Sequence, residues 1–134
     1  MKPIPVGAKG SFTLLVQPQH LANRFKDATL PAVFATPVMI MTMENAALNA
    51  IKAYLDPGES AVGTAVNVRH LAATPVGRQV TAEAEVTRVT GRQIEFTVLA
   101  KESAREIGVG THARVVVDVS KFTRRLAEEE SNRE

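Results

Sequence analysis

The chain has 134 residues, of which 45% are hydrophobic and 22% are charged. These fractions are typical of one folded globular domain, and they exclude disordered, collagen-like and low-complexity proteins. Sixteen Lys and Arg residues against fourteen Asp and Glu residues give a net charge of +2, without a long cationic block. One Tyr, five Phe and no Trp leave few rings to stack on bases, so we expect no nucleic-acid partner.

The absence of Cys excludes disulfides, thiolate catalysis and Cys-based metal sites. Residues 1–7 lack the apolar core of a signal peptide, and the most apolar run, residues 30–43, is too short to span a membrane. We therefore expect a cytoplasmic protein with no membrane partner. No repeat or linker divides the chain, so residues 1–134 are predicted to form one domain, with a charged tail at about 124–134, expected to be a solvated helix end or frayed.

The first predicted element is a half-buried strand at residues 11–16, where apolar and polar residues alternate. Residues 17–30 are mixed and predict loop or short helix. A long helix is predicted for residues 37–55, because Thr36 can cap its first amides and Pro37 fits its first turn. Residues 56–58, Asp-Pro-Gly, cannot continue a helix and predict its end.

Four alternating runs follow the helix, at residues 61–72, 79–88, 93–102 and 109–119. Each run has one apolar side, which in the last run consists of Val109, Ala113, Val115 and Val117. Short segments with turn residues separate the runs and favour an antiparallel meander. The predicted fold class is therefore α+β, with one curved antiparallel sheet wrapped around a long hydrophobic helix.

One carboxylate is predicted to lie on the apolar side of the helix. A helical wheel places Thr42, Asn45, Asn49 and Lys52 in one polar stripe. Glu44 falls about 120° from that stripe, among apolar residues that include Met41 and Leu48. A carboxylate in that sector is paired, lines a pocket or is very costly.

A histidine is predicted to face the same interior. His70 is in register with Val62, Val66 and Val68, so it points toward the helix. Glu44 and His70 can then meet where strand and helix pack together. Two interpretations remain open, a functional pair and a purely structural ion pair.

Thr36 and Gly63 each have two interpretations. Thr36 is predicted to cap the helix, and its hydroxyl also lies beside backbone N–H groups that could hold an oxyanion. Gly63 is a strand glycine, or a place where a ligand passes close to the backbone. His112 shares a strand side with Arg114, so we expect it in solvent or at a subunit contact.

The remaining candidates predict no site. His20 lies in an irregular stretch and has no predicted role, while Met39, Met41 and Met43 indicate core packing. No group of residues has the spacing of a metal site, so we expect no metal.

Several short motifs resemble those of one enzyme family. They are Val33-Phe34-Ala35-Thr36, Met43-Glu44, Pro57-Gly58-Glu59, Gly63-Thr64-Ala65 and His70-Leu71-Ala72-Ala73-Thr74-Pro75. Together they resemble the fluoroacetyl-CoA thioesterase family, from about residue 6 to residue 122. The resemblance implies a hotdog fold, a homodimer or a tetramer of such dimers, and hydrolysis of a small acyl-CoA, with coenzyme A as part of the substrate and no cofactor.

The resemblance also implies the site residues. The catalytic residues of the family fall on Thr36, Glu44 and His70, and Gly63 matches a glycine beside the active site. Phe34 and Leu30 are expected at the substrate. Leu30 stands where the fluoroacetyl-specific enzyme has an aromatic residue that closes over the acyl group.

In the mechanism that we expect, backbone amides and the Thr36 hydroxyl polarise the thioester carbonyl. Glu44 attacks that carbonyl or activates a water, and His70 orients Glu44 or protonates the leaving thiolate. The alternatives are a non-catalytic acyl-CoA binding protein, a hotdog hydratase or dehydratase, and a dimer with an inert ion pair.

Overall fold

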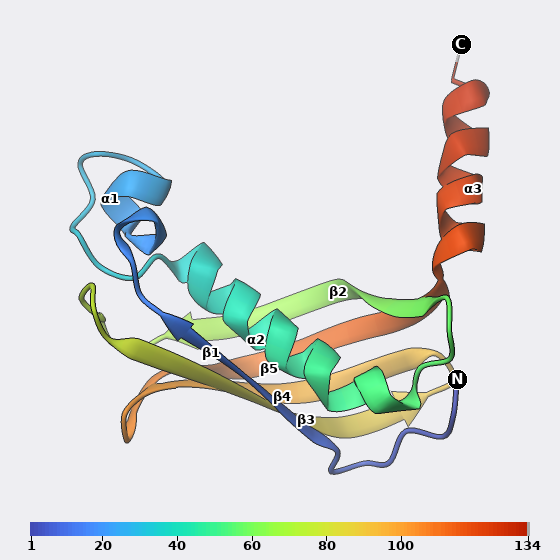
Figure 1. Ribbon diagram of the computed structural model, residues 1–134, viewed down its shortest axis with the longest axis horizontal. Helices are drawn as coiled ribbons and strands as arrows, with labels where there is room; N and C mark the ends of the chain where they lie inside the picture. The colour runs from blue at the N-terminus through green and yellow to red at the C-terminus, as the bar shows by residue number, and fades with distance from the viewer. Residues whose placement is uncertain (134) are drawn as a thin grey trace.

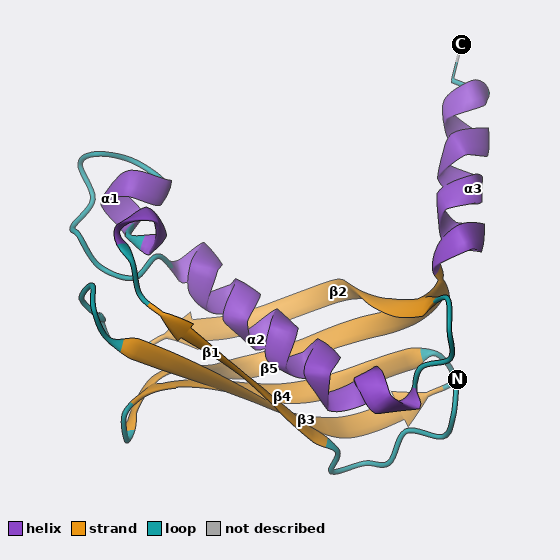
Figure 2. Cartoon of the chain, in the orientation of Figure 1, coloured by secondary structure: helices purple, strands orange, loops and turns teal. Residues whose placement is uncertain are grey.

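The computed structural model describes residues 1–133, which fold as one five-stranded sheet and a long helix (Figures 1 and 2). The strands are β1 Lys9–Leu15, β2 Glu59–His70, β3 Gln79–Thr90, β4 Gln93–Glu102 and β5 Arg105–Asp118. The helices are α1 Ala22–Phe25, α2 Thr36–Ile51 and α3 Val119–Ser131, with short 3-10 turns at Pro18–His20 and Lys52–Tyr54. The predicted α+β class is confirmed.

The long helix α2 lies across the concave face of the sheet (Figure 1). It begins one residue before the predicted start, and the last predicted turn is the 3-10 turn Lys52–Tyr54. Gly58 then takes a φ of 84°, which favours glycine and reverses the chain into β2. The predicted start and stop signals are thus confirmed to within about one turn.

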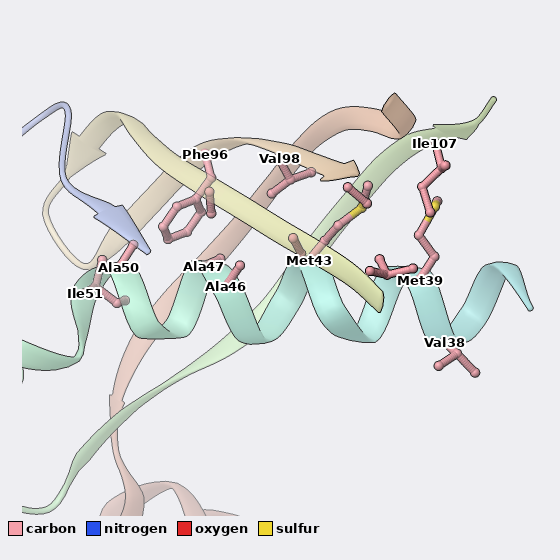
Figure 3. Close-up of a cluster of buried hydrophobic side chains, with 14 of the residues drawn as sticks. Val38, Met39, Met43, Ala46, Ala47, Ala50, Ile51, Phe96, Val98 and Ile107 are labelled. Atoms are coloured by element: carbon pink, nitrogen blue, oxygen red, sulfur yellow. The ribbon is translucent and has the colours of Figure 1, made fainter. Parts of the chain in front are cut away.

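The core lies between α2 and the sheet. Figure 3 shows Met39 and Met43 reaching from the helix toward Ile107 and Val98, while Val38 extends from the opposite side of the helix. Met39 and Met43 are fully buried, as the core-packing interpretation predicted. Two strand glycines let the helix approach: Gly10 faces the backbone of Ala46 and Ala50, and Gly108 faces the two methionine tips.

The sheet order β1-β3-β4-β5-β2 corrects part of the predicted meander. The pairs β3–β4 and β4–β5 are antiparallel neighbours, but β2 pairs with β5 at the edge of the sheet. The chain therefore crosses the sheet between β2 and β3. The residues of that connection bond to other elements instead of closing a hairpin: Phe34 N–H donates to Thr74 O (2.8 Å) and Gly77 N–H to Val16 O (2.8 Å).

A bulge in β2 shifts the predicted strand phase. Gly63 pairs with Arg114 and Ala65 with Ala113, so Thr64 is an extra residue without a counterpart on β5. After the bulge, Val66, Val68 and His70 share a face with Ala61 and Gly63, and Val62 lies on the other face. His70 faces the helix side as predicted, but Val62 does not.

The C-terminal helix α3 projects away from the sheet, beside the edge formed by β2 (Figure 1). The Asp118 side chain caps it by accepting from Lys121 N–H (3.0 Å), and none of its residues is buried. The predicted charged tail is therefore a solvated helix end; its last residue, Glu134, lies outside the described residues. Within residues 1–133, no helix has the length and hydropathy needed to cross a membrane.

Candidate active site

Thr36 and His70 meet where α2 begins and β2 ends. Thr36 Oγ1 lies 2.8 Å from His70 Nδ1, although the two residues are 34 positions apart. The prediction that Thr36 caps the helix is wrong, because Ala35 is the N-cap and makes no side-chain bond. Thr36 is already the first helical residue. Its exposed hydroxyl is therefore free to bond to the histidine.

His70 is held in a partly apolar environment. The Phe34 ring, which is fully buried, contacts the imidazole edge-on with ring centroids 6.5 Å apart. Burial lowers the pKa of His70 below its usual 6.5, and the backbone of Ala72 opposes this only in part. His70 is therefore neutral near pH 7. Its Nε2 is buried and has no hydrogen-bond partner within the described residues.

An open hollow of about 300 Å³ lies against this pair. It is lined by Thr36, His70, Leu71, Ala72 and Ala73, so one polar contact is surrounded by small and apolar groups. The hollow is open to solvent on one side, so the Thr36–His70 pair is accessible to a ligand. Leu30 is half-buried in a turn closed by its N–H to Asp27 O (3.1 Å), and it is not among the residues that line this hollow.

Glu44 belongs to a second cluster on the same helix. Eight residues separate it from Thr36, which is about 12 Å along the helix axis. Its carboxylate lies over Gly63 on β2, where an added Cβ would be 3.0 Å from Glu44 Oε2. Within residues 1–133, that carboxylate makes no hydrogen bond or ion pair, so its oxygens are available to a ligand or to water.

The helical wheel placed the buried side of α2 imperfectly. Glu44, Met41 and Leu48 are half-buried, at the margin of the contact with the sheet. Thr42, predicted in the polar stripe, is fully buried. Its hydroxyl donates to Met39 O (2.6 Å), and this bond to the helix's own backbone satisfies the polar group.

His112 and Arg114 complete the second cluster. Neither residue was expected in this position from the sequence. His112 was expected in solvent or at a subunit contact, but it is only 3% exposed, and Arg114 is 8% exposed. The error came from the phase of β5, which has valines on both faces; Val116, not Val115 or Val117, is in the core. The glycines at 108 and 110 on the same face were the available signal, since they mark close packing.

The other sequence candidates lie outside both clusters. His20 Nδ1 accepts from Gln17 N–H (3.0 Å) in the turn before α1. No group of three or more His, Asp or Glu side chains within residues 1–133 is arranged to hold a metal ion.

Known proteins are similar to this chain in sequence. Residues 16–120 match the family model described as fluoroacetyl-CoA-specific thioesterase. A curated relative, the fluoroacetyl-CoA thioesterase of Streptantibioticus cattleyicolor, is 46% identical over 99 residues, which are 74% of this chain and 71% of the relative.

Two solved structures are also similar over nearly their whole length. A mutant of the fluoroacetyl-CoA-specific thioesterase in complex with fluoroacetate and CoA is 40% identical, with a TM-score of 0.83 over 88% of this chain and 98% of the other. A thioesterase superfamily member from Thermus thermophilus is 31% identical, with a TM-score of 0.87 over 98% and 99%. These likenesses confirm the hotdog fold.

Proposed function

Because the chain belongs to the fluoroacetyl-CoA-specific thioesterase family, we propose that it hydrolyses a small acyl-CoA at a site built from Thr36, His70 and Glu44. The observation that carries this proposal is the 2.8 Å contact between the Thr36 hydroxyl and His70 Nδ1, beside an open hollow. A hydroxyl bonded to a neutral imidazole is the arrangement that activates an alcohol nucleophile. The CoA complex of a related enzyme supports the class of substrate.

The first step is acyl transfer to Thr36. Its Oγ1 attacks the thioester carbonyl while its proton passes to His70 Nδ1, which gives a tetrahedral intermediate with a negative oxygen. The start of α2 favours this charge: the backbone N–H of Thr36 has no partner within the described residues, and it lies at the positive end of the helix. The carbon–sulfur bond then breaks, and the thiolate of coenzyme A takes the proton from His70.

The second step hydrolyses the acyl ester on Thr36. A water must lose a proton as it attacks, and the Glu44 carboxylate is the general base in this proposal. One chain holds Glu44 about 12 Å along α2 from Thr36, which is too far for direct proton transfer. The proposal therefore needs a second copy of the chain, whose Glu44 approaches the Thr36–His70 pair.

The open edge of β2 supports such a homodimer. Strand β2 has a neighbour on one side only, and its central residues, 63–67, are exposed. An unpaired edge strand is a template for pairing with another strand. Twofold antiparallel pairing around Val66 and Asn67 brings the first half of one β2, with Gly63 and Glu44 beside it, next to the partner subunit's His70.

The acyl group is small in this proposal because the chain belongs to a family in which a curated member is a fluoroacetyl-CoA thioesterase. Leu30, which the resemblance placed at the substrate, is not among the residues that line the hollow beside Thr36, so it sets no limit on the acyl group in this proposal. The chemistry described uses no cofactor beyond the coenzyme A of the substrate. We place the reaction in the cytoplasm, in line with the sequence-based expectation.

A thiol-release assay with acetyl-, propionyl-, isobutyryl-, benzoyl- and fluoroacetyl-CoA tests the proposal. We expect release with at least one small acyl-CoA, and a loss of about 10²-fold or more in kcat for Thr36→Ala and for Glu44→Gln. The Glu44→Gln variant should also accumulate an acyl adduct on Thr36, measured as added intact mass. Release that is unchanged in both variants contradicts the assignment, and binding of acyl-CoA without release supports a non-catalytic protein.

A further inference from the structure

Two buried side chains beside Glu44, His112 and Arg114, have no role in the steps above. Both extend from β5 toward α2 and converge with Glu44 over Gly63. A Cβ at that position would lie 3.3 Å from His112 Cε1 and 3.8 Å from Arg114 Nη1. Glycine therefore leaves the space in which the three side chains meet.

The hydrogen bonds of this cluster fix the proton positions on His112. Arg114 Nη1 lies 3.1 Å from His112 Nε2. A guanidinium only donates, so Nε2 must accept and cannot carry a proton. The proton of the neutral ring is then on Nδ1, which donates to the Ala65 carbonyl at 2.8 Å. Burial lowers the pKa of His112, as this neutral form requires.

His112 is itself rigidly held. Its ring stacks on Phe96, with centroids 5.8 Å apart and planes 25° from parallel. Its acceptor, Ala65, follows the β2 bulge. The charged groups around the ring are Arg114 on β5 and Glu44 on α2; β2 and β4 contribute only the Ala65 carbonyl and the Phe96 ring.

The His112 ring is one of three groups that hold Arg114 in position. The other contacts of Arg114 are to backbone oxygens, Ala61 O at 2.6 Å and Glu44 O at 3.4 Å, and its Nε has no partner within the described residues. Among those residues, His112 is the one side chain that bonds to the guanidinium. Arg114 places its positive charge near Glu44 without an ion pair to it, so the carboxylate oxygens have no hydrogen-bond partner within the described residues.

We propose that His112 is a positioning residue, which acts as a hydrogen-bond acceptor at Nε2 and fixes the Arg114 guanidinium beside the Glu44 carboxylate. This role rests on the proposed hydrolysis, in which Glu44 is the general base. Without that acceptor, Arg114 Nη1 loses its side-chain partner while Nη2 stays bonded to Ala61 O, so Nη1 can turn toward the carboxylate and block it. The effect is then on turnover, with little change in substrate binding.

The first test needs no activity. Nitrogen-15 NMR of the His112 ring in the unmodified protein at neutral pH should show a protonated Nδ1 and an unprotonated, hydrogen-bonded Nε2. The chemical shift of Nε2 should change in the Arg114→Met variant. A proton on Nε2, or no response to Arg114→Met, overturns the proposal. This result stands whether or not the protein releases thiol, so it separates failure of this inference from failure of the proposed function.

The second test compares two substitutions. His112→Gln keeps an acceptor for Arg114 and a donor for Ala65, whereas His112→Phe keeps the stacking on Phe96 but has no acceptor. We expect His112→Phe to lower kcat by about tenfold, the effect of one lost bond to a charged group, with KM nearly unchanged. His112→Gln should restore most of that loss. The proposal is overturned if kcat falls equally in both variants or falls in neither. It is also overturned if His112→Phe lowers kcat by the same factor when Arg114→Met is already present.

Discussion

At the residue scale, the pKa of His70 sets the pH range in which the Thr36 hydroxyl can be activated. Burial against Phe34 disfavours the charged imidazole and lowers its pKa below 6.5. Only the neutral ring accepts the Thr36 proton, so activity should persist below pH 6.5 and fall as the pH drops through the lowered pKa.

A profile of kcat/KM from about pH 5 to pH 8 checks this prediction. A decline that already begins above pH 6.5 as the solution is acidified would show that His70 is not the group responsible. The pKa of His112 is lowered as well, so the profile is repeated with His112→Gln, which cannot titrate there. The acidic limb should remain in that variant.

Sequence reasoning at this scale succeeded in part. His70 faces the helix side as its strand periodicity predicted, but Glu44 is half-buried and lies in a different cluster, so the predicted Glu44–His70 contact is not formed within one chain. The contact between Thr36 and His70 was not recognisable from periodicity, because it joins residues 34 positions apart through the tertiary fold. His112 was misplaced because the apolar residues of β5 occupy both of its faces.

At the element scale, the close approach of α2 to β1 depends on Gly10. A Cβ at this position would overlap the backbone of Ala46 and Ala50, which cannot move without displacing the helix. Gly10→Ala should therefore lower the free energy of unfolding by about 1–3 kcal/mol or more, measured by urea denaturation.

Gly108→Ala is the matched control for that substitution. Its added Cβ meets the flexible tips of Met39 and Met43, which can rotate away, so the loss of stability should be smaller. Equal stability of the two variants would contradict the view that backbone contact, not side-chain crowding, sets the distance between helix and sheet.

The elements themselves were largely predictable, and their pairing was less so. The helix at 36–51 and the strands were found from apolar periodicity, to within a few residues at each end. The β2 bulge could not be seen, because one extra residue leaves no mark on composition but reverses the strand phase. The crossing from β2 to β3 was taken for a hairpin because its Thr-Pro-Val-Gly residues also suit a tight turn.

At the scale of the whole molecule, the candidate site residues of the described chain lie in two separate clusters. Thr36 and His70 lie at one end of α2, while Glu44, His112 and Arg114 lie near its middle, beside Gly63. The unpaired edge of β2 passes both places. A second copy paired along that edge would bring the two halves together, and this assembly is the central claim of the proposed mechanism.

Subunit complementation tests that claim most directly. Thr36→Ala and Glu44→Gln chains carrying different tags are co-expressed, and the mixed dimer is purified and assayed for thiol release. If each site takes Thr36 from one copy and Glu44 from the other, the mixed dimer contains one intact site. It should then have about half of the unmodified activity, although both parent dimers are inactive. Two results together would contradict the shared site. The first is a mixed dimer that is as inactive as its parents. The second is half of the unmodified activity in a dimer of one unmodified chain and one chain that carries both substitutions.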